Sequence, residues 1–198
     1  MYKNKHILIA GDSFSSDQLS GAYGWPVLLR QNFQITNISS PGIGEYKILQ
    51  NLQTTKLSDY DLVLISHTSS NRLHCVVNPL YPAGHLYSKS DIIFADAESK
   101  VNQELLAQGI VDYYKYIFDP NYYNFIHTCC CQQIEQLTQG IPTLHITHFE
   151  WSNLYPFNNM INFYNFWLNN RGEFAHYTKK ANQLIYQQIQ QTIQNMLI

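Results

Sequence analysis

The chain has 198 residues, enough for a single domain with a sizeable core. Its formal net charge is −2 and only 13% of its residues are charged, which argues against a nucleic-acid partner. The apolar stretch at 7–10 is too short for a secretory signal or a membrane span, so we expect neither. Four cysteines, at 75 and 129–131, lack the spacing of a disulfide framework or zinc site. We therefore expect free thiols and a cytoplasmic protein.

The predicted elements alternate between strands and helices along the chain. Strands are expected at 7–10, 34–38, 61–66 and 143–147, and helices near 25–30, at 45–52 and at 179–196. A turn-rich passage covers 74–95, helical spacing returns over 96–108, and residues 111–139 are predicted helical around a break at Asp119-Pro120. This order predicts an α/β fold, a three-layer α/β/α sandwich with a mainly parallel sheet. We expect one domain over 1–198, with an insertion or lid around 73–125.

The tripeptide Gly11-Asp12-Ser13 directly follows the first predicted strand. In open α/β sheets, ligands bind outside the carboxyl ends of the strands, so a hydroxyl at this place can meet a substrate. A tight turn here would also present backbone N–H groups, which an acyl-transfer oxyanion needs. Ser13 is thus a candidate nucleophile. The alternative is a turn or helix cap without a catalytic role.

A candidate base lies near the other end of the chain, in Glu173-Phe174-Ala175-His176. A carboxylate three residues before a histidine, on a loop entering a helix, can orient the imidazole while the other ring nitrogen accepts a serine proton. The alternative is a surface glutamate beside a helix-capping histidine.

These two blocks resemble those of the SGNH (GDSL) hydrolase family, which carries Gly-Asp-Ser near its N-terminus and Asp-x-x-His near its C-terminus. The family's second block, an asparagine followed five residues later by a glycine, is similar to Asn37 through Gly42. The resemblance implies a flavodoxin-like fold, with Ser13 as nucleophile and His176 as general base and then acid. It also implies an oxyanion hole made by the N–H groups of Ser13 and Gly42, with Gly44 as a nearby second candidate.

The chain departs from the family pattern in two places. Glu173 stands where the family usually has aspartate, a change that the chemistry tolerates because Ser-His-Glu arrangements occur on other folds. The third family block, Gly-x-Asn-Asp, is replaced by a sequence in which Ser70 falls on the asparagine position and Asn71 comes one residue later. The side-chain donor to the oxyanion is therefore expected to be Asn71, Ser70 or another group. Arg72 next to them is either an anion-binding or a structural pairing residue.

Further candidates for contact with substrate are Asp12, Gly44, His67, Arg72 and His148. The pair His145 and His148 is a weak metal signal, since alternate strand residues face opposite sides, and we expect no metal or cofactor. A Cys-His nucleophile at Cys129 and His127 is disfavoured because residues two apart point differently. Aromatic side chains over 113–123 and 151–167 are expected in the core more than on a binding platform.

Taken together, these residues predict a serine esterase that cleaves small esters, such as O-acetyl groups on sugars, through an acyl-enzyme. The expected partner is a small-molecule or carbohydrate ester. One alternative is an O-acyltransferase acting on a glycan or sugar precursor. Another is a catalytically weakened binding module with the same fold. The sequence leaves the oligomeric state open.

Overall fold

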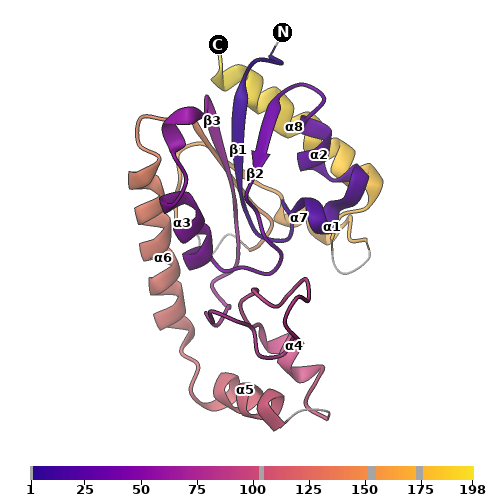
Figure 1. The fold of residues 1–198 in the computed structure, drawn as a ribbon, viewed down its shortest axis with the longest axis vertical. Helices are drawn as coiled ribbons and strands as arrows, with labels where there is room; N and C mark the ends of the chain where they lie inside the picture. The colour runs from indigo at the N-terminus through magenta and orange to yellow at the C-terminus, as the bar shows by residue number, and fades with distance from the viewer. Residues whose placement is uncertain (1, 103–104, 151–154, 173–175) are drawn as a thin grey trace.

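A parallel sheet forms the centre of the computed structural model, which describes residues 2–102, 105–150, 155–172 and 176–198 (Figure 1). Within these ranges the sheet has five strands in the order β2-β1-β3-β4-β5, and every neighbouring pair is parallel. The strands are β1 His6–Gly11, β2 Gln34–Asn37, β3 Leu62–His67, β4 Thr143–Thr147 and β5 Met160–Asn162. The predicted α/β sandwich with a mainly parallel sheet is confirmed, and its strand order is the flavodoxin-like one.

Strand β1 is apolar on both faces because helices cover the sheet on both sides. Ile7 and Ile9 face one hydrophobic cluster, whereas Leu8 and Ala10 face another, and all four are inaccessible to solvent. The strand ends at Gly11, where the next residues leave the sheet at its carboxyl edge. A buried central strand therefore delivers the Gly-Asp-Ser turn to the edge where ligands bind in such folds.

Helices α2 (Trp25–Leu29) and α8 (Lys179–Met196) cover one face of the sheet. The bounds of α8 match the prediction from its periodic apolar residues. Ile185, Ile189 and Ile193 recur every four residues and are buried against the sheet. The Thr178 side chain accepts a hydrogen bond from the Ala181 N–H at 3.2 Å and so caps the start of the helix.

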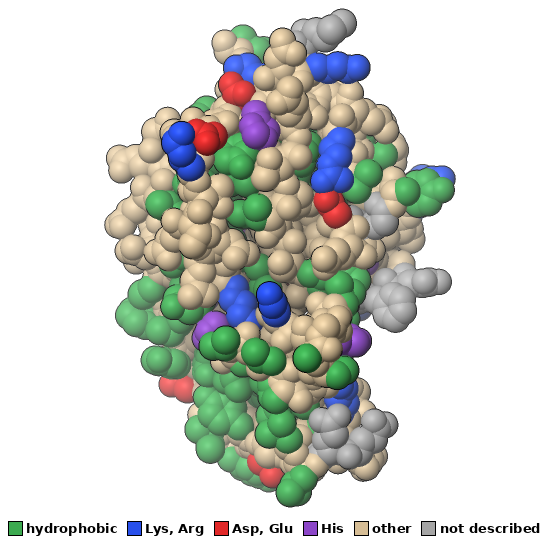
Figure 2. Space-filling view, viewed as in Figure 1, with side chains coloured by type: hydrophobic (Ala, Val, Ile, Leu, Met, Phe, Trp, Pro, Cys, Tyr) green, Lys and Arg blue, Asp and Glu red, His purple; other side chains and the backbone are tan. Residues whose placement is uncertain are grey.

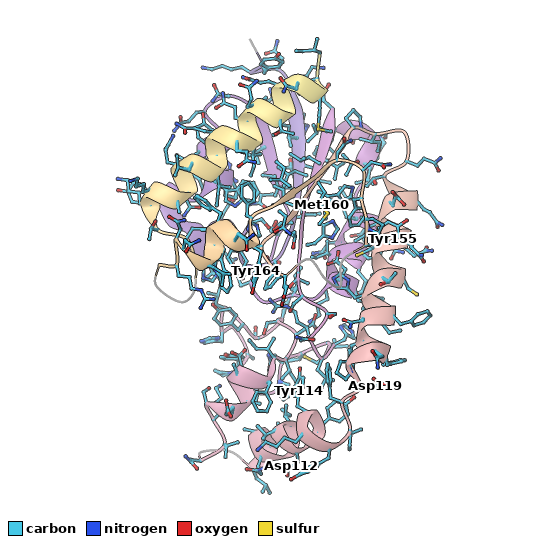
Figure 3. All side chains as sticks on the ribbon, turned by 180° about the vertical axis from the view of Figure 1, so that it is seen from behind. Asp112, Tyr114, Asp119, Tyr155, Met160 and Tyr164 are labelled. Atoms are coloured by element: carbon cyan, nitrogen blue, oxygen red, sulfur yellow. The ribbon has the colours of Figure 1, made fainter. Side chains whose placement is uncertain are left out.

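Helices α3 (Glu45–Gln53) and α6 (Pro120–Leu137) cover the opposite face. The sequence predicted a break at Asp119-Pro120, and α6 begins there. Asp119 caps the helix by accepting from the Asn121 N–H at 2.9 Å, and Pro120 occupies the first turn, where no N–H is needed (Figure 3). Tyr155 lies beside this helix and donates its hydroxyl to Glu135, which joins the chain after β4 to α6.

Four short or intermediate helices complete the described chain, with two 3₁₀ turns. They are α1 Asp17–Ser20, α4 Phe94–Glu98, α5 Leu105–Tyr116, α7 Tyr164–Leu168, η1 Gly21–Tyr23 and η2 Leu57–Asp59. The helical spacing predicted over 96–108 is found in part: α4 ends at Glu98, residues 99–102 form turns, and α5 begins at Leu105. The two helices pack into one cluster through Ala97 and Ala107. The sequence also missed β5 and α7. No helix in the described ranges is both long and apolar enough to cross a bilayer.

Residues 73–125, expected as an insertion or lid, contain α4 and α5, which lie beyond the carboxyl ends of the strands (Figure 1). They have a hydrophobic cluster of their own, built around Leu80, Ile92 and Val111. Tyr114, labelled in Figure 3, closes this cluster by donating its hydroxyl to the Ile92 carbonyl at 2.8 Å. Figure 2 shows apolar side chains gathered over this part of the surface. The exposed apolar residues of the 73–125 segment include Val76, Val77, Tyr116, Ile117 and Phe125.

Candidate active site

The turn after β1 is shaped by steric and hydrogen-bond constraints. A Cβ atom on Gly11 would lie 2.4 Å from Ser15 Oγ and 2.6 Å from the Ser66 carbonyl oxygen, so only glycine fits. The buried Asp12 carboxylate accepts from the Phe14 N–H at 3.1 Å, and the Asp12 carbonyl accepts from the Ser15 N–H at 3.2 Å. These bonds fold the chain back around Ser13, which stays half-buried at the edge of the sheet.

Ser13 lines a cavity of about 430 Å³ together with residues from distant parts of the sequence. Gly42 and His176, which the family resemblance also implicates, are in the same wall. The other lining residues are Phe14, Arg72, Tyr81, Tyr87, Ser90, Asp91, Ile93, Asp96, Phe149 and Trp167. Its volume lies within the usual range for small-molecule sites, about 300–1,000 Å³.

His176 is held at the cavity by its ring and by its backbone. Its ring centroid lies 5.1 Å from that of Phe14, the residue after the candidate nucleophile. Its carbonyl accepts from the Gly172 N–H at 2.5 Å, and the next residue, Tyr177, bridges to Arg171. Glu173, the expected orienting carboxylate, lies outside the described residues.

Gly42, a candidate oxyanion donor, lies at a position that only glycine fits. Its φ of +71° is in the region that favours glycine, and a Cβ atom there would lie 2.7 Å from Ser90 Cβ. Its carbonyl is fixed by the Asp91 N–H at 3.0 Å and by Arg72 Nη1 at 2.9 Å. Among the described residues, neither the Gly42 N–H nor the Ser13 N–H has a hydrogen-bond partner, so both are available to a ligand.

Arg72 connects three segments around the cavity. Its guanidinium donates to Thr68 Oγ1 at 2.7 Å and to the Gly42 carbonyl, and pairs with Asp12 at 3.3 Å. Guanidinium has five N–H donors, and these contacts use three, which leaves two for the cavity. Burial raises the pKa of Asp12 to about 6, even though Arg72 and the Phe14 N–H both act to lower it.

Neither of the two expected side-chain donors to the oxyanion lines this cavity. Ser70 instead donates to Asn124 Oδ1 at 2.5 Å, and it lines a separate, smaller cavity. The Asn71 side chain is exposed, and its carbonyl accepts from the Tyr114 hydroxyl at 3.3 Å. The side chain that this loop does bring to the cavity is Arg72.

Four other candidates for contact with substrate, Asp12, Gly44, His67 and His148, are not among the residues that line this cavity. Gly44 donates its N–H to Asp91 Oδ2 at 2.6 Å and lines the smaller cavity. His67 is fully buried and hydrogen-bonded to Glu45 and His145.

His148 is fully buried as well and has a supporting position behind the site. It stacks on Phe14 with a centroid separation of 4.5 Å, and its Nδ1 bonds to the Tyr177 hydroxyl at 2.7 Å. Burial lowers the pKa of His148 to about 3. The neutral ring therefore packs against Phe14, the residue that follows the candidate nucleophile.

Sequence reasoning missed most of the outer cavity wall, which comes from the 73–125 segment. Tyr81, Tyr87 and Asp96 lie in this wall. Lys100 lies over the Tyr81 ring at 4.0 Å, and burial raises the pKa of Tyr81 to about 12 and that of Asp96 above its usual value. In the sequence, this wall was indicated only by the prediction of an insertion or lid around 73–125.

A group able to hold a metal ion lies outside this cavity. Within the described chain, one set of three side chains has suitable donor atoms close together, namely Glu45, His67 and Cys131. None of them lines the cavity of Ser13.

Comparisons with known proteins leave the family open. A scan against protein-family models finds no match, and a search of curated proteins finds none either. A solved lipase/acylhydrolase from Enterococcus faecalis is similar over 96% of both chains, with 11% identity and a TM-score of 0.44. A gut microbial diltiazem-metabolizing enzyme matches 74% of this chain with 10% identity and a TM-score of 0.38, and the chain spans 27% of its length. Similarities this distant carry no information about chemistry, which must be inferred from the site itself.

Proposed function

We propose that the protein is a serine esterase of the SGNH type that hydrolyses small esters through an acyl-enzyme. One observation carries the proposal: Ser13, Gly42 and His176, from three distant segments, line one cavity at the carboxyl edge of a parallel sheet. These are the residue types that nucleophilic acyl transfer needs: a hydroxyl, a backbone donor and an imidazole.

In the proposed mechanism, Ser13 Oγ attacks the ester carbonyl carbon while its proton passes to His176. Glu173 orients the imidazole and stabilises its charged form. The carbonyl π electrons move onto oxygen, and this oxyanion accepts hydrogen bonds from the N–H groups of Ser13 and Gly42. Collapse of the intermediate expels the alcohol, which takes the proton from His176. A water molecule then attacks the acyl-enzyme by the same route and releases the acid and free Ser13.

We assign the third oxyanion donor to Arg72 in place of Asn71 or Ser70. Arg72 is the one of the three that lines the cavity, and its bond to the Gly42 carbonyl places its guanidinium next to the backbone donor. A fixed cation beside developing negative charge stabilises the transition state more than the neutral substrate. Asp12, pairing with the same guanidinium, holds it in this orientation.

The cavity wall bears on the substrate class. The cavity beyond Ser13 is lined by aromatic side chains and by the Asp96 carboxylate. The aromatic residues come from the 73–125 segment and from the region after β4. Aromatic faces with a nearby carboxylate suit a carbohydrate, whose C–H faces stack and whose hydroxyls donate hydrogen bonds. We therefore propose an O-acyl ester on a sugar as the substrate, with the 73–125 segment acting as a lid.

The same wall supports a second candidate, an O-acyltransferase for a glycan or sugar precursor. A cavity that excludes water after acylation would favour transfer of the acyl group to a sugar hydroxyl.

The cytoplasmic location of the protein stays a prediction.

The test is the steady-state hydrolysis of acetylated sugars and p-nitrophenyl acetate by wild type, Ser13→Ala and Ser90→Ala. Ser90 is a second serine in the same cavity wall, so it controls for the general effect of losing a hydroxyl there. We expect kcat to fall by about 1,000-fold or more in Ser13→Ala and to change little in Ser90→Ala. Acetylated product that appears only when an acceptor sugar is added would favour the transferase. Folded wild type with no turnover and no transfer would support the binding module.

A further inference from the structure

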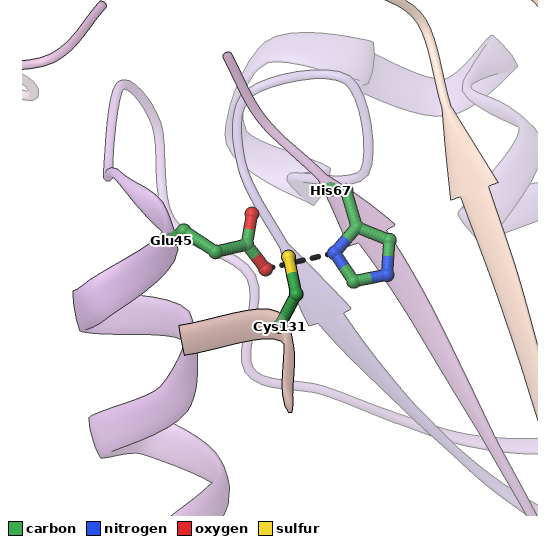
Figure 4. Close-up of side chains that lie close together, drawn as sticks. All are labelled: Glu45, His67 and Cys131. Carbon is green, nitrogen blue, oxygen red and sulfur yellow. Dashed lines mark hydrogen bonds and ion pairs between the residues drawn. The ribbon is translucent and has the colours of Figure 1, made fainter. Parts of the chain in front are cut away.

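A cluster of metal-ligand side chains is buried between α3, α6 and the sheet, outside the proposed active site. Glu45 begins α3, His67 ends β3 and Cys131 lies inside α6. All three are buried, and one donor atom from each lies within 4.8 Å of the other two. Figure 4 shows the carboxylate, the imidazole and the thiol pointing toward one another.

The donor separations are near those of a tetrahedral metal site. Zinc bonds of about 2.0–2.3 Å place neighbouring ligand atoms about 3.3–3.7 Å apart. The separation between Glu45 Oε1 and His67 Nδ1 is 2.8 Å, so this pair would open by about 0.5 Å around an ion. Cys131 Sγ lies within 4.8 Å of the donor atoms of Glu45 and His67. Adjustments of this size need no change in the packing of the helices.

Each of the three side chains also has a partner that would fix its orientation as a ligand. His67 Nε2 lies 2.9 Å from His145 Nδ1, so the ring nitrogen remote from the cluster has an acceptor. Glu45 Oε2 accepts from the Thr68 N–H at 3.2 Å and lies 3.3 Å from His127 Nε2. Cys131 Sγ lies 3.6 Å from His127 Nδ1. Metal-bound side chains typically have such outer partners, and these strongly affect metal affinity.

We propose that Glu45, His67 and Cys131 bind a zinc ion. A carboxylate and a thiolate together neutralise a divalent cation, which makes the site compatible with complete burial. The sulfur and imidazole donors favour zinc over magnesium or calcium, which prefer oxygen ligands.

The ion would join three elements that are far apart in the sequence. It would tie α6, which begins within the 73–125 segment, to the start of α3 and the end of β3. Thr68, which bonds both to Glu45 and to Arg72, links this cluster to the loop that lines the Ser13 cavity. The zinc site would therefore be structural. Its existence does not depend on the proposed esterase activity.

Cobalt is a suitable probe because Co²⁺ replaces zinc in such sites and a bound thiolate gives it a charge-transfer absorption band. Purified full-length protein is stripped with a chelator, exchanged into metal-free buffer and titrated with Co²⁺ and then Zn²⁺. We expect the thiolate band to reach its maximum at one equivalent of Co²⁺ and to disappear when zinc displaces it. Zinc should also raise the thermal unfolding midpoint of the stripped protein.

Two variants separate the proposed ligand from its neighbour. Cys131→Ser should abolish the band and weaken zinc binding by about 100-fold or more, since even outer partners of a metal are worth about 10–100-fold. The serine hydroxyl can still donate to His127 Nδ1, so the metal-free network is preserved. Cys130→Ser, in which another buried thiol is changed, should keep both the band and the affinity.

Absence of the thiolate band in folded wild type would overturn the proposal, as would an unchanged band in Cys131→Ser or its loss in Cys130→Ser instead. If Cys131→Ser does not fold, as judged by circular dichroism, Glu45→Gln provides the decision. Zinc affinity that falls by about 100-fold in Glu45→Gln supports the site, and unchanged affinity excludes it.

Discussion

Replacement of Arg72 by lysine tests the assignment of the third oxyanion donor. Lysine keeps the positive charge but replaces a planar group with five N–H donors by a single ammonium. Of the three contacts that Arg72 makes, with Thr68 Oγ1, the Gly42 carbonyl and Asp12, one ammonium on a flexible stem can keep about one. At about 1 kcal/mol for each lost hydrogen bond, the free energy of unfolding should fall by about 2 kcal/mol.

The effect on catalysis should be larger than the effect on stability. Loss of one oxyanion donor costs about 100- to 1,000-fold in kcat, or about 2.7–4 kcal/mol of transition-state stabilisation. Because the oxyanion forms only in the transition state, kcat should fall while KM changes little. The assay is hydrolysis of p-nitrophenyl acetate over a range of concentrations, with urea unfolding of the same samples to show that the variant is folded.

Asn71→Ala is the matched control, since Asn71 precedes Arg72 and has an exposed side chain. An exposed substitution of this kind typically changes stability by less than about 0.5 kcal/mol, and we expect its kcat to stay near that of wild type. The reasoning would be refuted if Arg72→Lys kept kcat within about threefold of wild type. A large loss of kcat in Asn71→Ala would return the donor role to Asn71.

Three further predictions concern the residues that build the site and its support. Gly42→Ala should lower kcat and destabilise the fold, because a Cβ atom meets Ser90 Cβ at 2.7 Å and because φ is positive, which alone costs about 1–2 kcal/mol; unchanged thermal unfolding and kcat would contradict this. Burial raises the Asp12 pKa from 3.8 to about 6, so its contribution to stability is present below pH 3.8 and is lost as the pH rises through 6. The free energy of unfolding of Asp12→Asn, relative to wild type, should therefore increase by about 2 kcal/mol between pH 4 and pH 7 in urea titrations, and a decrease would show that the sign is wrong. Ile189→Ala should cost about 2–5 kcal/mol because the side chain is fully buried, whereas the exposed Leu184→Ala should cost less than about 0.5 kcal/mol; equal losses in chemical denaturation would argue against the packing of α8.

The parts of the fold that the sequence predicted have strong local signals. Continuous burial of β1 leaves an uninterrupted apolar run, and Ile185, Ile189 and Ile193 give α8 a clear period. Pro120 after Asp119 marks the start of α6. Strand β5 has only three residues and pairs on one side, so it lacks an alternating pattern long enough to detect.

The parts of the site that were not predicted from the sequence depend on contacts between distant residues. Sequence alignment to a family motif pointed to Ser70 or Asn71, but the loop after β3 turns so that Arg72 faces the cavity. The spacing of a motif fixes which residues are available, whereas the path of a loop fixes which of them reaches the site. The aromatic outer wall comes from the 73–125 segment, whose turn-rich sequence has no periodicity from which its packing could be predicted.

The proposed zinc ligands are likewise far apart in the sequence. His145 and His148 are close together in the sequence and gave a weak metal signal. His148, however, is stacked on Phe14 and is not one of the proposed ligands. The proposed ligands come from α3, β3 and α6, and no short motif connects them. Only the folded chain brings them together.

The central claim is that Ser13 is an activated nucleophile, and reaction with a fluorophosphonate probe tests it most directly. The measurement is intact mass under native conditions for wild type and Ser13→Ala, with peptide mapping of the adduct. We predict one stoichiometric adduct on Ser13 in wild type and none in the variant. A folded wild type that remains unlabelled, or an adduct that persists in Ser13→Ala, would contradict the proposed function.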